Sequence, residues 1–216
     1  MEILNDLELA TELNKWLRQR VDELNRPARS AGIHLTELIY CLTRGFYERI
    51  NPIPRTDKDN ILLGLGIALE RLLIPIEQRV SAGTKDGIDY SPDFYFKDNE
   101  PAELKTTRMS TKKTLTREFP ETWLQQIKGY CYCAGKLIYR LGVLHLLGDY
   151  HPPFPEILAV RFIFTEQELK DNWNYLLNRK SIYIKAFVDG IPPEPRRWCQ
   201  KWECSTCQYI ERCGVK

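Results

Sequence analysis

Two carboxylates and a lysine lie close together near the middle of the 216-residue chain. Asp93 begins one predicted strand, and Glu103 and Lys105 lie on the next, after a turn at 97–100. Alternate residues of a strand share a face, so Glu103 and Lys105 project together and a hairpin brings Asp93 beside them. Paired carboxylates suit Mg²⁺ or Mn²⁺, and a nearby lysine can stabilise negative charge or polarise an attacking water. By itself the pattern leaves open two interpretations, metal-assisted hydrolysis and solvated charges on a half-exposed hairpin.

Three further side chains have types that such a site would use. Gln126 and Tyr130 are four residues apart on a predicted helix and share one face, where they can orient a water and bind a phosphate. Glu70 lies inside an otherwise apolar helical run, and we expect it at the edge of the core as an additional metal ligand. Asp89 is a rival for the first carboxylate, but Asp93 is favoured because it leads directly into an aromatic strand.

The chain resembles the RecB-like branch of the PD-(D/E)xK nuclease superfamily in three motifs, Pro92-Asp93, Glu103-Leu104-Lys105 and Gln126-xxx-Tyr130. The resemblance covers roughly residues 36 to 213. It implies that Asp93, Glu103 and the Leu104 carbonyl bind the divalent ion. It also implies that Lys105 assists water attack on the phosphodiester, with the glutamine and the tyrosine as the branch's paired motif.

One residue departs from the family pattern. The branch often has Gly-xxx-His on the early helix, and here Gly66 is followed at that place by Glu70. A glutamate serves as a metal ligand in related nucleases, so the expectation of a metal-dependent DNA nuclease, an exonuclease by preference, stands. The alternative is a catalytically silent DNA-binding or assembly subunit with a structural metal site.

The seven cysteines are the second chemical feature, because three of them, at 204, 207 and 213, have the spacing C-x₂-C-x₅-C. The chain starts with an acidic, amphipathic segment that does not resemble an export signal, and its number of cysteines is odd. Both features argue against a disulfide framework. Three thiolates so close together can hold one face of a zinc ion or an iron–sulfur cluster. For the fourth ligand the spacing leaves open Cys199, which is local, and Cys41, which is far upstream.

The stretch 38–47 resembles the first-cysteine segment of iron–sulfur RecB-like nucleases, which pair one N-terminal cysteine with a late C-x₂-C-x₅-C. The resemblance implies a [4Fe-4S] cluster, with [2Fe-2S] or zinc as lesser alternatives, held by Cys41, Cys204, Cys207 and Cys213. Such a cluster would join the two ends of the chain and would be structural in role. We expect Cys131 and Cys133 in the core and Cys199 as a spare.

The net charge of +2 indicates no particular partner, but basic residues are concentrated after the predicted site strand. Residues 105–117 hold five basic side chains and no acid. We expect four of them to contact DNA phosphates rather than to form a plain solvated loop: Arg108, Lys112, Lys113 and Arg117. Single-stranded DNA or DNA ends are the expected substrate. The compact CRISPR-associated exonucleases fit the length best, which implies CRISPR adaptation proteins or a helicase as partners, with phage recombination or repair as the other pathways.

The order of elements predicts an α/β (α+β) domain with a restriction-endonuclease-like core, in which helices flank a short mixed sheet. The expected domains are a helical region at 1–57 that supplies Cys41, a nuclease core at 58–190 and a cysteine-rich segment at 191–216. We expect helices at 3–25, 36–47, 58–74, 120–134 and 166–187, and strands at 76–80, 94–96, 102–106, 137–147 and 157–164.

The longest uncharged apolar stretch is residues 61–69. A membrane helix needs about 20 such residues, so we expect no membrane partner and a cytoplasmic location.

Overall fold

The structure is a computed structural model, and it describes residues 7–24, 31–108, 118–146, 156–194 and 199–214. The chain divides into two compact units. One consists of residues 1–30 and 54–76, and the other of residues 31–53 and 77–216. The domain boundaries at 57 and 190 stay a prediction. Among the described residues, no helix is long and apolar enough to cross a membrane.

Helices α1 (Leu7–Leu24) and α4 (Asp57–Leu73) pack together in the smaller unit. Gly64 permits this approach, because a Cβ there would lie 3.1 Å from a methyl group of Val21. The N-cap Thr56 accepts a hydrogen bond from the backbone N–H three residues later, and the helix ends before Pro75 as its sequence predicts.

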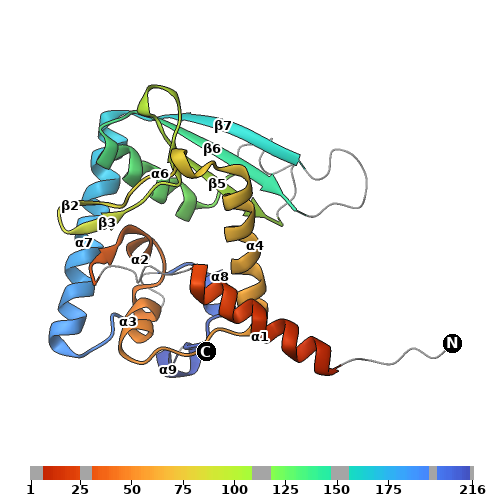
Figure 1. Ribbon diagram of the computed structural model, residues 1–216. Helices are drawn as coiled ribbons and strands as arrows, with labels where there is room; N and C mark the ends of the chain where they lie inside the picture. The colour runs from red at the N-terminus through yellow and green to blue at the C-terminus, as the bar shows by residue number, and fades with distance from the viewer. Residues whose placement is uncertain (1–6, 25–30, 109–117, 147–155, 195–198, 215–216) are drawn as a thin grey trace. The chain divides into compact units, whose positions relative to one another are not determined.

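The larger unit contains a four-stranded mixed sheet (Figure 1), in the order β4-β5-β6-β7. Its strands are β4 (Phe94–Tyr95), β5 (Pro101–Thr107), β6 (Ile138–His145) and β7 (Glu156–Ile163). The pair β5–β6 is parallel and the other two pairs are antiparallel. Parallel neighbours need a crossover connection, and α6 (Glu121–Ala134) lies within it and covers one face of the sheet. The predicted α+β fold with a short mixed sheet is confirmed.

A second, three-stranded sheet has the order β1-β3-β2 and consists of β1 (Ile33–His34), β2 (Gly83–Lys85) and β3 (Ile88–Tyr90). The turn between β2 and β3 uses left-handed backbone at Gly87, where φ is +68°. The predicted strand at 76–80 is wrong, since this segment starts with the 3₁₀ turn η1 (Ile76–Gln78). Ile76 is 78% exposed, so its apolar side chain finds no sheet face to cover.

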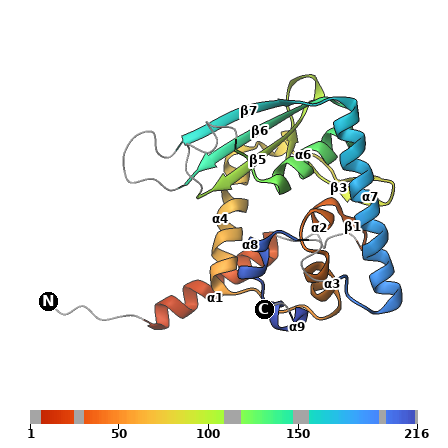
Figure 2. The same ribbon diagram turned by 180° about the vertical axis from the view of Figure 1, so that it is seen from behind.

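Three further helices carry the rest of the core (Figure 2): α2 (Leu35–Ile39), α3 (Leu42–Ile50) and α7 (Glu166–Asp189). Helices α2 and α7 pack on α6, and α3 packs on α2 and α7. Helix α7 begins with a capping box at Thr165 and ends at Gly190 in the left-handed conformation. The predicted single helix from Thr36 is wrong, because His34 is the N-cap and the chain leaves the helical conformation at residues 40 and 41. Two short helices end the chain, α8 (Lys201–Ser205) and α9 (Ile210–Cys213).

Candidate active site

The hairpin between β4 and β5 brings Asp93 to Glu103, as the sequence predicts. The turn η2 (Lys97–Asn99) reverses the chain with left-handed backbone at Asp98 and Asn99, residue types that tolerate it. Phe94 pairs with Ala102, so the next register position sets Asp93 opposite Glu103. A carboxylate oxygen of Asp93 accepts the backbone N–H of Leu104 at 2.8 Å.

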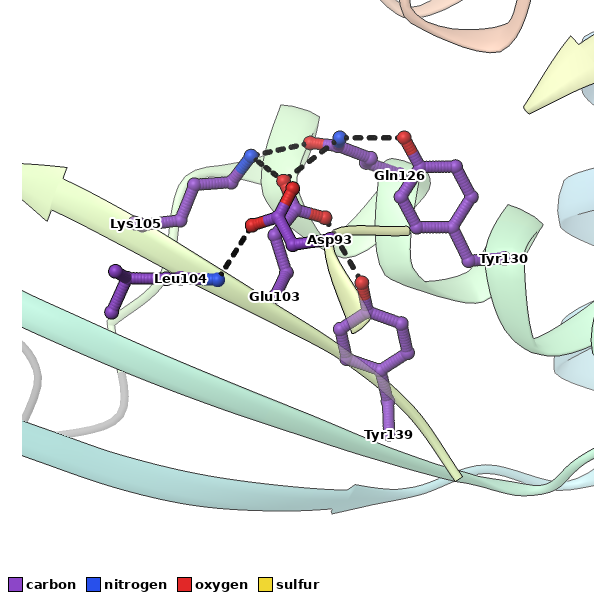
Figure 3. Close-up of polar contacts among 7 residues, drawn as sticks. All are labelled: Asp93, Glu103, Leu104, Lys105, Gln126, Tyr130 and Tyr139. Carbon is purple, nitrogen blue, oxygen red and sulfur yellow. Dashed lines mark hydrogen bonds and ion pairs between the residues drawn. The ribbon is translucent and has the colours of Figure 1, made fainter. Parts of the chain in front are cut away.

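Glu103, Lys105 and Gln126 form one polar network between β5 and α6 (Figure 3). The Lys105 ammonium donates to Glu103 Oε1 and, at 2.9 Å, to Gln126 Oε1. The Gln126 amide nitrogen donates to Glu103 Oε1 at 3.0 Å and to the Tyr130 hydroxyl at 3.1 Å. All the catalytic residues predicted from the motifs therefore lie in one place.

Burial shapes the protonation of this network. Burial alone lowers the pKa of Lys105, but the charges of Glu103 and Asp93 outweigh it, and the net pKa is raised. Burial, followed by the charge of Glu103, raises the pKa of Tyr130 well above its usual value. The site therefore holds an ammonium and a neutral phenol at neutral pH.

The sequence analysis missed Tyr139, which lies on β6 and is fully buried. Its hydroxyl donates to Glu103 Oε2 at 2.9 Å, so Glu103 has hydrogen bonds at both oxygens (Figure 3). The parallel register pairs Glu103 with Leu141, which puts Tyr139 on the same sheet face. Tyr40 was also missed, and it lies near enough to contribute to the raised pKa of Lys105.

The oxygen donors on β5 fit the chemistry of a divalent cation. Backbone groups of Glu100 and Leu104 both point toward the β4 edge, since Phe96 N–H bonds to Glu100 O and Leu104 N–H bonds to Asp93. The N–H and C=O of one strand residue share a direction, so the Leu104 carbonyl lies on the side of Asp93. Two carboxylates and a carbonyl are the oxygen ligands that Mg²⁺ and Mn²⁺ prefer.

The two remaining candidate ligands are on other elements. Asp89 is on β3 in the three-stranded sheet, where it accepts a hydrogen bond from Thr84 at 2.6 Å. Glu70 is on α4 in the smaller unit, and its role as a metal ligand stays a prediction. Within the described residues, no three His, Cys, Asp or Glu side chains converge into a metal site by themselves.

Of the four basic residues predicted to contact DNA, only Arg108 is in a described segment, where it is exposed just beyond β5. Lys112, Lys113 and Arg117 lie outside the described residues. Their predicted contacts with DNA stay a prediction.

The predicted cluster cysteines all lie in the larger unit. Burial, followed by the charges of Cys41, Cys207 and Cys204, raises the pKa of Cys213 to about 11. Cys199 joins this group, because its sulfur lies 3.5 Å from that of Cys204. The sequence analysis treated Cys199 as a spare, and its position makes it a rival fourth ligand. Thiols are the ligand type that iron–sulfur clusters and zinc prefer, and the cluster itself stays a prediction.

Contacts between α3 and α9 hold the two ends of this group together. The rings of Tyr47 and Tyr209 stack with their centroids 5.9 Å apart, and the Tyr47 hydroxyl donates to Arg212 O at 3.3 Å. The Tyr209 hydroxyl in turn accepts the backbone N–H of Ile53 at 2.9 Å.

The prediction for the central cysteines is confirmed for Cys131, which is fully buried in the core.

Comparisons with known proteins indicate the fold. No family model matches the chain, and no curated protein matches it. The crystal structure of SSO0001 is similar, with a TM-score of 0.60 and 16% identity over 95% of this chain and 96% of that one. An alkaline exonuclease, LHK-Exo from Laribacter hongkongensis, has a TM-score of 0.51 and 13% identity over 82% of this chain and 94% of its own. A phage-related exonuclease from Haemophilus somnus 129PT has a TM-score of 0.50 and 10% identity over 75% of this chain and 97% of its own. The chain therefore shares its fold with two exonuclease structures.

Proposed function

We propose that the chain is a Mg²⁺- or Mn²⁺-dependent deoxyribonuclease that hydrolyses phosphodiester bonds, by preference as an exonuclease on single-stranded DNA or DNA ends. The observation that carries this proposal is the meeting of Asp93, Glu103 and Lys105 with Gln126 and Tyr130 of α6. Two exonuclease structures with the same fold support it, as does the resemblance to the RecB-like motifs.

Each residue of the network has a role in this proposal. Asp93, Glu103 and the Leu104 carbonyl would hold the divalent ion. When bound, that ion supplies Lewis-acid charge to the phosphodiester and lowers the pKa of a water molecule. Lys105 remains an ammonium because its pKa is raised, and it stabilises negative charge on the phosphate. Gln126 holds Lys105 and Glu103 in place through its amide.

We extend the proposal to a structural [4Fe-4S] cluster on Cys41, Cys204, Cys207 and Cys213. The clustering of their thiols supports it, and Cys199 is the alternative to one of the four. A cluster would supply covalent links between segments about 160 residues apart and so restrict the unfolded chain. The arrangement of cysteines also suggests a place in CRISPR adaptation or in DNA recombination and repair.

Substitutions at the two rival carboxylates, Asp93 and Asp89, and at Lys105 test the proposed nuclease activity. The variants are Asp93→Ala, Lys105→Ala and, as the matched control, Asp89→Asn on the other sheet. We expect the first two to abolish Mn²⁺-dependent degradation of end-labelled single-stranded DNA while retaining the circular dichroism spectrum and DNA binding. The control should remain active. Degradation that survives Asp93→Ala, or that is lost only in Asp89→Asn, would contradict the site.

The silent-subunit alternative predicts a different result for the wild-type protein. DNA binding without cleavage in Mg²⁺, Mn²⁺ or any other divalent ion would favour that alternative.

Anaerobic purification tests the cluster separately. A colourless protein with stoichiometric zinc and no iron would refute the iron–sulfur assignment.

A further inference from the structure

The chain bends out of the helical conformation between α2 and α3, where the sequence pattern predicts a continuous helix. Tyr40 has ψ −174° and Cys41 has ψ 114°, both outside the helical range. Such a break removes the hydrogen bonds that successive turns of a helix provide to one another. Cys41 is 9% exposed, so its backbone groups need partners within the protein.

Two buried charged side chains supply those partners. Arg179 of α7 is 1% exposed, and its guanidinium donates to the carbonyl of Tyr40 at 2.6 Å and to that of Leu38. Glu203 of α8 is 3% exposed, and its carboxylate accepts the N–H of Cys41 at 2.9 Å. One peptide unit, between Tyr40 and Cys41, is therefore held at its oxygen by a cation and at its nitrogen by an anion.

Both charged residues are themselves held in orientation. Arg179 also donates to the Tyr175 hydroxyl at 3.0 Å, and the second carboxylate oxygen of Glu203 accepts the N–H of Gln200 at 3.0 Å. Burying an arginine and a glutamate costs several kcal/mol per ion before their interactions are counted. A straight helix would need neither residue.

The consequence of the bend is the position of the Cys41 thiol. The cysteines that it would join come from the other end of the chain, where the sulfurs of Cys199 and Cys204 lie 3.5 Å apart. The Cys41 N–H is bound by the carboxylate of Glu203, which is 162 positions from Cys41 and directly precedes Cys204. One contact thus brings the backbone of the early cysteine segment to the backbone of the late one.

We propose that Arg179 and Glu203 are positioning residues that clamp the Tyr40–Cys41 peptide unit and so present Cys41 to the C-terminal cysteines for metal binding. The clamp rests on the proposed function, because it assumes that Cys41 is a ligand of the cluster. The planar guanidinium suits this role, since it reaches two carbonyls at fixed directions as a lysine cannot.

Iron retention in the full chain tests the clamp. Glu203→Ala and Arg179→Met remove its two halves, and Glu203→Gln keeps an amide oxygen that can accept one N–H. The matched control is Arg49→Met, because Arg49 also holds a backbone carbonyl, that of Gly32, and pairs with a carboxylate of α2, but does not contact residues 40 and 41. After anaerobic purification, the measurements are iron per chain and the chelator concentration that removes half of it.

We expect Glu203→Ala and Arg179→Met to lose iron to the chelator about 10- to 100-fold more readily than the wild type, as for other residues that orient metal ligands. Glu203→Gln should be intermediate and Arg49→Met unchanged. The Cys41 amide, followed by hydrogen exchange in the iron-free wild type, should be protected and should lose protection in Glu203→Ala. This second readout separates loss of position from general unfolding, which would expose every amide.

Wild-type iron retention in both clamp variants would overturn the clamp, and so would equal iron loss in Arg49→Met. Cys41→Ser separates this failure from failure of the proposed cofactor. If Cys41→Ser keeps its full iron content, or if the reconstituted wild type binds neither iron nor zinc, the cofactor assignment is wrong and the clamp falls with it.

Discussion

Replacing Tyr139 with phenylalanine removes one hydroxyl from the candidate active site and leaves the ring in place. The hydroxyl donates to Glu103 Oε2 at 2.9 Å, and neither residue is exposed by more than 4%. No water can easily replace the lost donor at this depth. The substitution therefore isolates the contribution of one hydrogen bond to the orientation of the proposed metal ligand.

The size of the effect follows from the charge and the burial of Glu103. A hydrogen bond to a charged group is worth about 1.5–3 kcal/mol. A factor of ten corresponds to about 1.4 kcal/mol, so the loss corresponds to about 10- to 100-fold. Residues that orient metal ligands change metal affinity by about the same factor. We expect the Mn²⁺ concentration for half-maximal cleavage of single-stranded DNA to rise by this amount.

Tyr183→Phe is the matched control. Tyr183 is also buried, but its hydroxyl lies beside Arg49 and not beside a proposed metal ligand. Its removal should leave the Mn²⁺ dependence unchanged. An unchanged Mn²⁺ midpoint in Tyr139→Phe would refute the reasoning, and so would an equal shift in Tyr183→Phe.

Three further predictions concern charge, thiol reactivity and packing. The ion pair between Lys105 and Glu103 raises the pKa of Lys105 in the folded state above its ordinary value of 10.5. The pair therefore stabilises the fold most at pH values below 10.5. The difference in unfolding free energy between wild type and Lys105→Met should shrink as the pH rises above that value, and a constant difference would contradict the pair. Burial raises the pKa of Cys131 to about 12, so iodoacetamide at pH 8 should leave it unmodified in the native protein and modify it in denaturant, as peptide mass spectrometry would show. Gly129→Ala should lower the unfolding free energy by about 1–2 kcal/mol in a denaturant titration, because its Cβ would lie 2.6 Å from a methyl group of buried Leu35 and the strain exceeds the gain in helix propensity; an equal or greater stability would refute this packing.

Local sequence signals located most of the candidate active site. The alternation of a strand puts Glu103 and Lys105 on one face, and the helical repeat does the same for Gln126 and Tyr130. The polar turn at 97–99 then determines which carboxylate meets them. Each of these relations spans about ten residues or fewer, where backbone geometry leaves few alternatives.

Contacts between distant segments determined the rest. Tyr139 reaches Glu103 only because β6 pairs in parallel with β5, and its own neighbours in the sequence give no sign of this. The apolar spacing around Cys41 favours one continuous helix, yet Arg179 and Glu203 bind its backbone and stabilise a break. Cys199 likewise joins the other thiols only in the folded chain.

The sequence by itself determined which residue types this protein has for chemistry and on which face of each strand or helix they lie. Periodicity is a property of the backbone, so a short segment already contains that information. Only the tertiary structure decided which second residues hold those groups in place and where a helix must stop. Those choices depend on hydrogen bonds between segments as many as 165 residues apart, which no local pattern encodes.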